Sequence, residues 1–384
     1  MVALHEYYIK HDFNPTTHDI KNVNKFNIHK NKRDNLLINK LNIHPRVWND
    51  AKVLEIGCSS GENTLLFALM GSKLTIIEPI EKSIQQLQNL FINYNTTHSI
   101  NKIYIDLIDN VYFNDKFDII VIEGLIHSLS NKKLILRKIF SYLNDYGLLI
   151  LSTSNSVGGF IELIKSLIIQ LYCRKNKINH LSQKVEAAKL FFQQDYNSIP
   201  HSRKFELWAK DVLFNPLMLN ECYYDFDMII SDISDLSPNF YSSWPSYQPV
   251  NDLTWHKKVT GLDSELNKIL DSYHLKENSF ILGDILNNIE SLEFLYKYNN
   301  IKTKDTIHDI YKYANNIINH IDITLLINKL KEMCIFKHPK INKVINDIII
   351  VLSNLSPGSY MAASNLRSYW GVPNHYIVLS KGFI

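Results

Sequence analysis

The regular alternation between residues 51 and 152 constrains the fold of this 384-residue chain more than any other feature of its sequence. Short runs of apolar, mostly β-branched residues alternate there with segments in which apolar residues recur at helix spacing. Strands that are apolar throughout, with helices between them, predict a parallel sheet buried on both faces and hence an α/β fold. We predict strands at Val53–Ile56, Lys73–Ile77, Lys102–Ile105, Phe117–Ile122 and Leu148–Ser152, and helices at Glu62–Met70, Glu81–Tyr94 and Asn131–Leu143.

Two glycines, Gly57 and Gly61, lie in the turn that follows the first predicted strand. Glycine adopts left-handed backbone conformations and lets other groups come close. A strand, a glycine turn and a helix N-terminus together form a cradle for a nucleotide-like ligand. The spacing lacks the GxGxxG pattern of nicotinamide enzymes and the GK[ST] of a phosphate-binding loop. A nicotinamide dehydrogenase is therefore disfavoured, and a purely structural turn remains the alternative.

Acidic and histidine side chains follow the later predicted strands. Glu78 follows the second strand, Asp106 the third, and Glu123 and His127 the fourth. The carboxyl ends of strands line the ligand crevice of open α/β sheets, so we expect these side chains to converge. A carboxylate at Glu78 can accept hydrogen bonds from both hydroxyls of a ribose. Asp106 could meet an adenine amino group, with Asp109 as the competing candidate.

The alternation ends after Thr153, which predicts an elaboration beyond the α/β core. We divide the chain into an N-terminal extension (1–50), a core (51–235) with a helical segment (156–222), an aromatic loop (236–262), a helical insertion (263–356) and a final segment (357–384). Phe226–Ile230 and His375–Leu379 are predicted as the last two strands of the core sheet.

Composition excludes several classes of protein. The 41 basic and 38 acidic residues give a formal charge of +3, too weak to favour a nucleic-acid surface. The four cysteines are scattered without a CxxC pair, so neither a disulfide framework nor a metal site is predicted. The longest apolar tract, Phe160–Cys173, is interrupted by charge and too short to span a bilayer, and the N-terminus lacks a signal-peptide pattern. We predict a cytoplasmic protein without membrane insertion.

Residues 51–155 resemble the class I S-adenosylmethionine-dependent methyltransferases. The resemblance rests on the glycine turn Val53–Gly61, on Ile76-Ile77-Glu78, and on the segments FDIIVIEGLIHSL (117–129) and LNDYGLLILS (143–152). It implies a Rossmann-like, mostly parallel sheet of seven strands whose last strand is antiparallel, with the helical insertion before that strand. It also implies S-adenosyl-L-methionine as the cofactor. One residue departs from the family pattern, because Ser59 stands at the third glycine of the usual motif.

The same resemblance assigns roles in the cofactor site. Glu55 and Gly57 would shape the methionine end, Gly61 its floor, and Glu123 would lie near the transferred methyl group. Glu78 would hold the ribose and Asp106 the adenine. The complete set of predicted cofactor residues is Glu55, Gly57, Cys58, Ser59, Gly61, Glu78, Asp106 and Glu123.

Methyl transfer from a sulfonium requires an aligned nucleophile, and a base assists when that nucleophile is a hydroxyl. His127 is the first candidate for the base and His201 the second. The alternative for His127 is packing or capping at a strand–helix junction, and for His201 a surface position. Residues 122–125, Ile-Glu-Gly-Leu, lack the [DN]PP[YF] pattern of enzymes that methylate nucleobase amines, so a nucleic-acid acceptor is disfavoured.

We therefore predict O-methylation of a small hydroxyl-bearing substrate, such as a sugar or natural-product intermediate. A protein substrate is one alternative, since long helical appendages can bind polypeptides. A non-catalytic S-adenosylmethionine-binding module, in which the insertion serves assembly, is the other. No oligomeric state is predicted.

Overall fold

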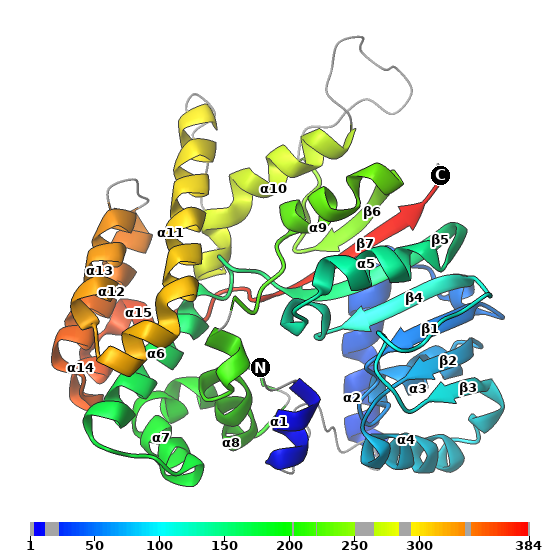
Figure 1. Ribbon diagram of the computed structural model, residues 1–384, viewed down its shortest axis with the longest axis horizontal. Coiled ribbons are helices and arrows are strands. Elements are labelled where there is room, and N and C mark those ends of the chain that lie inside the picture. The colour runs from blue at the N-terminus through cyan, green and yellow to red at the C-terminus, as the bar shows by residue number, and fades with distance from the viewer. Residues whose placement is uncertain are drawn as a thin grey trace. The chain divides into compact units, whose positions relative to one another are not determined.

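The computed structural model describes residues 4–11, 23–201, 203–219, 221–249, 265–283, 293–334 and 339–382. The chain divides into two compact units, each built from segments that are distant in sequence (Figure 1). The first, which we call the sheet unit, contains Met1–Thr153, Tyr224–Leu270 and His375–Ile384. The second, the helical unit, contains Ser154–Tyr223 and Asp271–Asn374.

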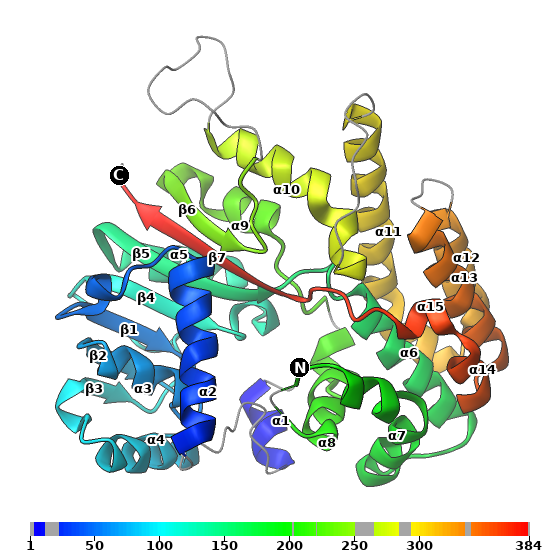
Figure 2. The ribbon, with the colours of Figure 1, turned by 180° about the vertical axis from the view of Figure 1, so that it is seen from behind.

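A seven-stranded sheet with the strand order β3-β2-β1-β4-β5-β7-β6 organises the sheet unit (Figure 2). Strand β1 pairs in parallel with β2 and β4, β2 with β3, and β4 with β5, whereas β6 and β7 are antiparallel. This arrangement confirms the predicted fold class. The strands are Lys52–Ile56 (β1), Lys73–Ile77 (β2), Ile100–Tyr104 (β3), Phe117–Glu123 (β4), Leu143–Ser154 (β5), Pro238–Trp244 (β6) and Asn374–Lys381 (β7).

The prediction of a strand at Phe226–Ile230 is wrong, because these residues begin helix α9 (Phe226–Ile233). Phe226, Ile229, Ile230 and Ile233 are all buried, and their spacing of three, four and seven residues is that of one helix face. A short apolar run cannot be distinguished from a strand by composition alone. The sixth strand, β6, instead lies within the predicted aromatic loop, of which residues 250–262 fall outside the described ranges.

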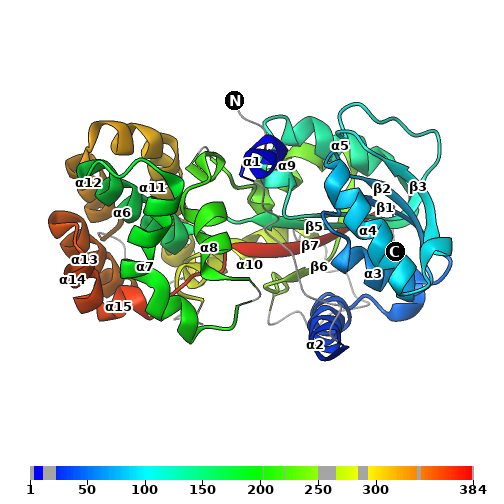
Figure 3. The same ribbon diagram turned by 90° about the horizontal axis from the view of Figure 1, so that it is seen from below.

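Helices cover both faces of the sheet. Helices α5 (Lys132–Ser141) and α9 lie on one face, while α2 (Val23–Asp34), α3 (Glu62–Leu69) and α4 (Glu81–Asn93) lie on the other (Figure 3). Short helical turns connect these elements: η1 (Asn35–Lys40), η2 (Pro45–Trp48), η3 (Thr97–Ser99), η4 (Ile126–Ser128) and η7 (Ser234–Leu236). Helix α1 spans Leu4–Lys10.

Part of the predicted N-terminal extension belongs to the hydrophobic core. Leu37, Leu41, Ile43 and Trp48 are at most 1% exposed and pack in the same cluster as Val53 of β1. The Trp48 ring also stacks on Phe67 of α3, with the ring centroids 4.6 Å apart. Burial of large side chains of this kind stabilises a fold by about 1.5–3 kcal/mol each, so residues 37–48 help to hold the sheet together.

The helical unit joins two segments that the sequence analysis treated separately, 156–222 and 263–356. Pro339 begins α13, which suits the preference of proline for the first helical turn. In the described ranges, no helix combines the length and the apolar character that crossing a bilayer requires. The helices are α6 (Phe160–Lys175), α7 (Leu181–Ser198), α8 (Phe205–Trp208), η5 (Ala209–Leu213), η6 (Pro216–Leu219), α10 (Glu265–Leu282, entering the unit at Asp271), α11 (Glu293–His320), α12 (Ile323–Cys334), α13 (Pro339–Asn354), α14 (Pro357–Ala362) and α15 (Ser364–Arg367).

Candidate functional site

The turn between β1 and α3 contains three residues in the left-handed region: Gly57 (φ 78°), Ser59 (φ 51°) and Gly61 (φ 87°). Ser59 therefore takes a conformation that glycine adopts without strain, which fits its place at the third glycine of the motif. A Cβ atom at Gly61 would lie 2.7 Å from Cγ of Leu87 in α4. Both the backbone conformation and the packing of α4 therefore require glycine at position 61.

Glu78 connects this turn to the end of β2. Its side chain is buried, and Oε2 accepts a hydrogen bond from the Ser59 amide at 3.0 Å while Oε1 accepts one from the Ile80 amide at 3.0 Å. Burial raises the pKa of this carboxyl, and the two amide donors oppose that shift. Each carboxylate oxygen has a second lone pair, so Glu78 can still accept hydrogen bonds from two further donors.

Glu55 is a second buried carboxyl beside the turn. It lies in β1, and burial raises its pKa to about 8. Among the described residues its Oε2 atom has no hydrogen-bond partner. Burial, together with the charge of Glu55, also raises the pKa of the Cys58 thiol well above its usual range. The Oε2 atom of Glu55 is thus an acceptor without a donor among the described residues.

Glu123, at the end of β4, forms an ion pair with Arg33 of the N-terminal helix α2. Arg33 Nη2 donates to Glu123 Oε1 at 2.7 Å, and Asn63 Nδ2 of α3 donates to Oε2 at 2.9 Å. Arg33 Nη1 also donates to the Tyr376 hydroxyl of β7 at 3.4 Å. Burial opposes the charge on Arg33, but the carboxylate of Glu123 outweighs that effect and the Arg33 pKa is raised. The pair connects α2, α3, β4 and β7.

Arg33, Asn63 and Tyr376 are not among the site residues predicted from the sequence. A weak signal for Arg33 was present, because Phe26, Arg33 and Leu37 recur at intervals of seven and four residues. Phe26 and Leu37 both contact the hydrophobic core, so this spacing marks the inward face of α2 and its continuation. A basic residue on that face is a candidate partner for a buried acid.

Asp106 and Asp109 both follow β3, and the structure gives them different surroundings. Asp106 Oδ1 is exposed and accepts hydrogen bonds from Asn110 Nδ2 at 2.8 Å and from the Leu107 amide at 2.7 Å. These two donors, Asn110 first, lower its pKa. Asp109 Oδ1 accepts a hydrogen bond from Asn131 Nδ2. Both carboxylates therefore remain candidates for the adenine contact.

His127 and His201 belong to different units. His127 lies in η4, directly after β4, and is 8% exposed. Burial and the nearby Lys132 charge lower its pKa to about 4, and its Nδ1 atom has no hydrogen-bond partner in the described part of the chain. His201 is exposed in the helical unit, where Nδ1 lies 2.9 Å from the Ile199 carbonyl oxygen and the ring packs on Tyr196.

Comparison with known proteins agrees with this architecture. Residues 29–213 match the family model described as a methyltransferase domain. Solved structures similar to the chain include the N-methyltransferase NodS from Bradyrhizobium japonicum in complex with S-adenosyl-L-homocysteine, with 19% identity, coverage of 33% of this chain and 62% of that one, and a TM-score of 0.28. TehB from Haemophilus influenzae shows 22% identity, coverage of 33% and 46%, and a TM-score of 0.27.

A putative S-adenosylmethionine-dependent methyltransferase from Listeria monocytogenes shows 20% identity, coverage of 29% and 50%, and a TM-score of 0.26. The chain thus spans less than two thirds of the length of each of these structures. No curated protein matches the sequence at a significant level. On the family match, the strand order and the glycine turn, residues 29–213 of this chain contain a class I S-adenosylmethionine-dependent methyltransferase domain, whose cofactor is S-adenosyl-L-methionine.

Proposed function

We propose that the protein transfers a methyl group to a hydroxyl of a small molecule, such as a sugar or natural-product intermediate, with His127 as the base. The observation that carries this proposal is the position of His127. It lies directly after β4, at the carboxyl edge of the sheet, and its Nδ1 atom has no partner in the described residues. An uncharged imidazole with a free nitrogen can accept the proton of a hydroxyl nucleophile.

The residues of the glycine turn fit the cofactor. Gly57 and Gly61 place backbone, without side chains, at the cradle, and Glu78 retains two lone pairs for the ribose hydroxyls. The unpartnered Oε2 of Glu55 suits the cationic end of the methionyl group. We assign Cys58 and Ser59 to the same methionine end, and Asp106 or Asp109 to the adenine.

Glu123 takes a different role in this proposal from the one implied by family resemblance. Both of its carboxylate oxygens already accept hydrogen bonds, from Arg33 and Asn63. Glu123 would therefore fix helix α2 over the turn rather than act on the acceptor. The bound cofactor supplies an electrophilic methyl group on a sulfonium. His127 would take the acceptor's proton at a ring nitrogen, and His201 is the second candidate for that step.

The free thiols of Cys58 and Cys173 suit a reducing compartment, which fits the proposed cytoplasmic location.

Calorimetric titration with S-adenosylmethionine tests the cofactor part of the proposal. Wild-type protein should bind, and Glu78→Ala should lose measurable affinity because the ribose hydroxyls lose their acceptor. A wild-type protein without affinity would overturn the proposal.

A panel of hydroxyl-bearing acceptors, read out as S-adenosylhomocysteine release, tests the chemistry. His127→Asn should lower kcat by about 100-fold or more with unchanged cofactor affinity. The matched control is His98→Asn, an exposed histidine of η3. A loss in His201→Asn instead would move the base to His201. Labelled methyl on added polypeptide would favour a protein acceptor, and binding without turnover on any acceptor would favour a non-catalytic module.

A further inference from the structure

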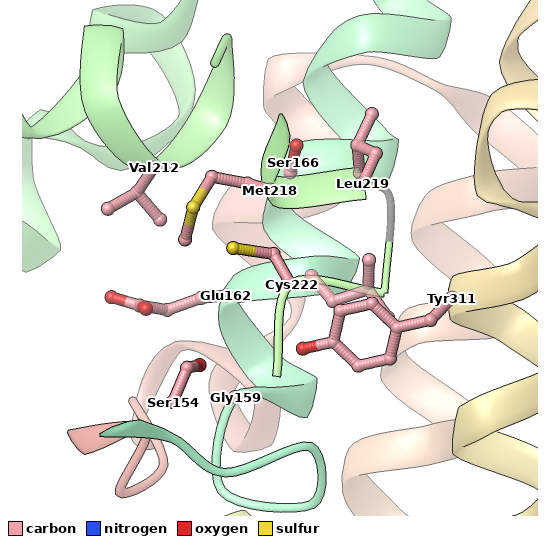
Figure 4. Close-up of a pocket in the computed structure, with 10 residues that line it drawn as sticks. Ser154, Gly159, Glu162, Ser166, Val212, Met218, Leu219, Cys222 and Tyr311 are labelled. Atoms are coloured by element: carbon pink, nitrogen blue, oxygen red, sulfur yellow. The ribbon is translucent and has the colours of Figure 1, made fainter. Parts of the chain in front are cut away.

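A cavity in the helical unit combines one open carboxylate with an apolar wall (Figure 4). Ser154, the last residue of β5, Glu162 of α6 and Tyr311 of α11 supply polar side chains to it. Its volume is about 320 Å³, a figure that includes the part open to solvent, so a ligand would lie partly in the open mouth of the cavity.

We propose that this cavity binds a small molecule with one hydroxyl and an apolar body, and that Glu162 accepts the hydrogen bond of that hydroxyl. Glu162 Oε1 already accepts a hydrogen bond from the Trp208 indole Nε1 at 3.3 Å. No donor to Glu162 Oε2 occurs among the described residues, and this side chain is partly exposed to the cavity. Burial raises the pKa of the carboxyl, while Trp208, Arg203 and Lys165 oppose that shift.

Ser166, another polar residue of the cavity, competes less for a ligand. Ser166 Oγ donates to the Leu213 carbonyl oxygen at 2.8 Å and accepts from Gln170 Nε2 at 3.0 Å. Its hydrogen-bonding capacity is therefore largely used within the chain. The Oε2 atom of Glu162 remains the polar atom best placed to select a ligand group, because a carboxyl oxygen without a donor favours ligand groups that donate over groups that only accept.

The remaining wall of the cavity is apolar or sulfur-bearing, and is formed by Leu163, Val212, Met218, Leu219 and Cys222. Figure 4 shows the Met218 and Cys222 sulfurs on the same side as the Glu162 carboxyl group. Thioether and aliphatic side chains adapt to hydrocarbon and aromatic surfaces and leave extra hydroxyls without partners. The wall therefore favours an alcohol or phenol with an apolar body over a polyhydroxylated sugar.

Gly159 sets the size of the cavity. A Cβ atom at this position would lie 2.9 Å from the Tyr311 hydroxyl and 3.0 Å from the Asn155 carbonyl oxygen. Alanine would therefore push Tyr311 or the loop into the open space. Gly358 of α14 provides a matched control in the same unit, because a Cβ atom there meets nothing within 4 Å.

This inference goes beyond the proposed function, since it assigns the helical unit a ligand site of its own and does not take that ligand to be the methyl acceptor. Binding to the cavity itself can be measured without the cofactor and without turnover.

Fluorine NMR on the full chain, with para-fluorophenol, para-fluoroanisole and fluorobenzene as probes, tests the proposal. Wild-type protein should bind the phenol about tenfold more tightly than the anisole, which has no donor. In Glu162→Gln the Trp208 bond can persist on the amide oxygen, and the amide nitrogen, a donor only, then faces the cavity. In this variant the anisole should therefore bind more tightly than the phenol.

Gly159→Ala should bind all three probes more weakly than the wild type does, whereas Gly358→Ala should bind them with wild-type affinity. Circular dichroism confirms that each variant is folded. The proposal is overturned if no probe binds the wild type, or if folded Glu162→Gln keeps the original order. Failure of S-adenosylmethionine to bind would overturn the proposed function alone, and the phenol preference would then identify a ligand site of another activity.

Discussion

The sheet unit and the helical unit each bury a cation, Arg33 and Lys165, and hold it in opposite ways. In the sheet unit, Arg33 and Glu123 form a direct ion pair at 2.7 Å, and Glu78 accepts two backbone amides. In the helical unit, Lys165 is fully buried, yet its Nζ atom has no hydrogen-bond partner in the described ranges and lies 3.1 Å from the centre of the Trp370 ring. Arg33 is thus stabilised by a carboxylate counter-ion, whereas Lys165 packs on an aromatic face and burial lowers its pKa to about 7.

We expect the largest effect from breaking the ion pair between Arg33 and Glu123 in the sheet unit. Arg33→Met leaves Glu123 buried without its counter-ion, which should lower the free energy of unfolding by about 3–5 kcal/mol. Urea unfolding followed by circular dichroism measures the change. The double variant Arg33→Met/Glu123→Gln should recover most of the loss, because no unpaired charge remains. A double variant as unstable as the single one would show that packing of Arg33, and not its charge, stabilises the unit.

The next effect tests the backbone of the glycine turn. Gly61→Ala adds left-handed strain and a clash with Leu87, and should destabilise the protein by about 2–4 kcal/mol. Gly124→Ala is the matched control, since its φ is 66° but a Cβ atom there meets nothing within 4 Å. It should cost only about 1–2 kcal/mol in the same urea experiment. If both variants lost the same free energy of unfolding, the contact with Leu87 of α4 would not contribute to the effect of Gly61→Ala.

In the helical unit, replacing the buried cation should raise the free energy of unfolding instead of lowering it. Lys165→Met removes a buried amine and should raise the free energy of unfolding by about 1–2 kcal/mol at neutral pH. Burial lowers the Lys165 pKa to about 7, below its value in the unfolded chain, so the unfolded state binds more protons between pH 7 and the unfolded pKa. Wild-type stability should therefore rise relative to Lys165→Met as pH increases above about 7. If the difference in the free energy of unfolding between Lys165→Met and the wild type grew with pH, the lowered pKa of Lys165 would be contradicted.

The smallest effect concerns His127, whose pKa is lowered to about 4 in the folded chain. Between this value and the unfolded pKa the unfolded state binds more protons, so the wild type loses stability as pH falls. Relative to His127→Gln the loss should reach about 1 kcal/mol at about pH 5.5. Urea midpoints at neutral and acidic pH measure it, with His98→Gln as the exposed control. A pH-independent difference would mean that His127 is charged or solvated when folded.

The α/β core could be predicted because each of its strands is a short apolar run. The β2 strand has the predicted limits Lys73–Ile77, and α3 and α4 begin at the predicted Glu62 and Glu81. Glu55, Glu78 and Glu123 could be named because acidic residues at the ends of apolar strands have little reason to be there other than a site or a partner.

Other features depend on contacts that a local pattern does not contain. The apolar run in Phe226–Ile233 is compatible with a strand by composition alone. These residues form helix α9, which packs against α5. Strand β6 carries buried Ser242 and Ser243, whose hydroxyls donate to the carbonyl oxygens of Leu41 and Pro245. Polar residues in a half-buried strand conceal the alternation that sequence analysis uses.

The position of β7 has a consequence for the order in which the protein can fold during synthesis. Asn374–Lys381 lies between β5 and β6, so β6 lacks its antiparallel neighbour until these residues have been made. About 130 residues separate Trp244 from Asn374, which corresponds to roughly 6–26 s of translation at ordinary rates. During that interval the edges of β5 and β6 are open to wrong pairing. Chaperone demand should therefore be greatest while the helical insertion is being synthesised.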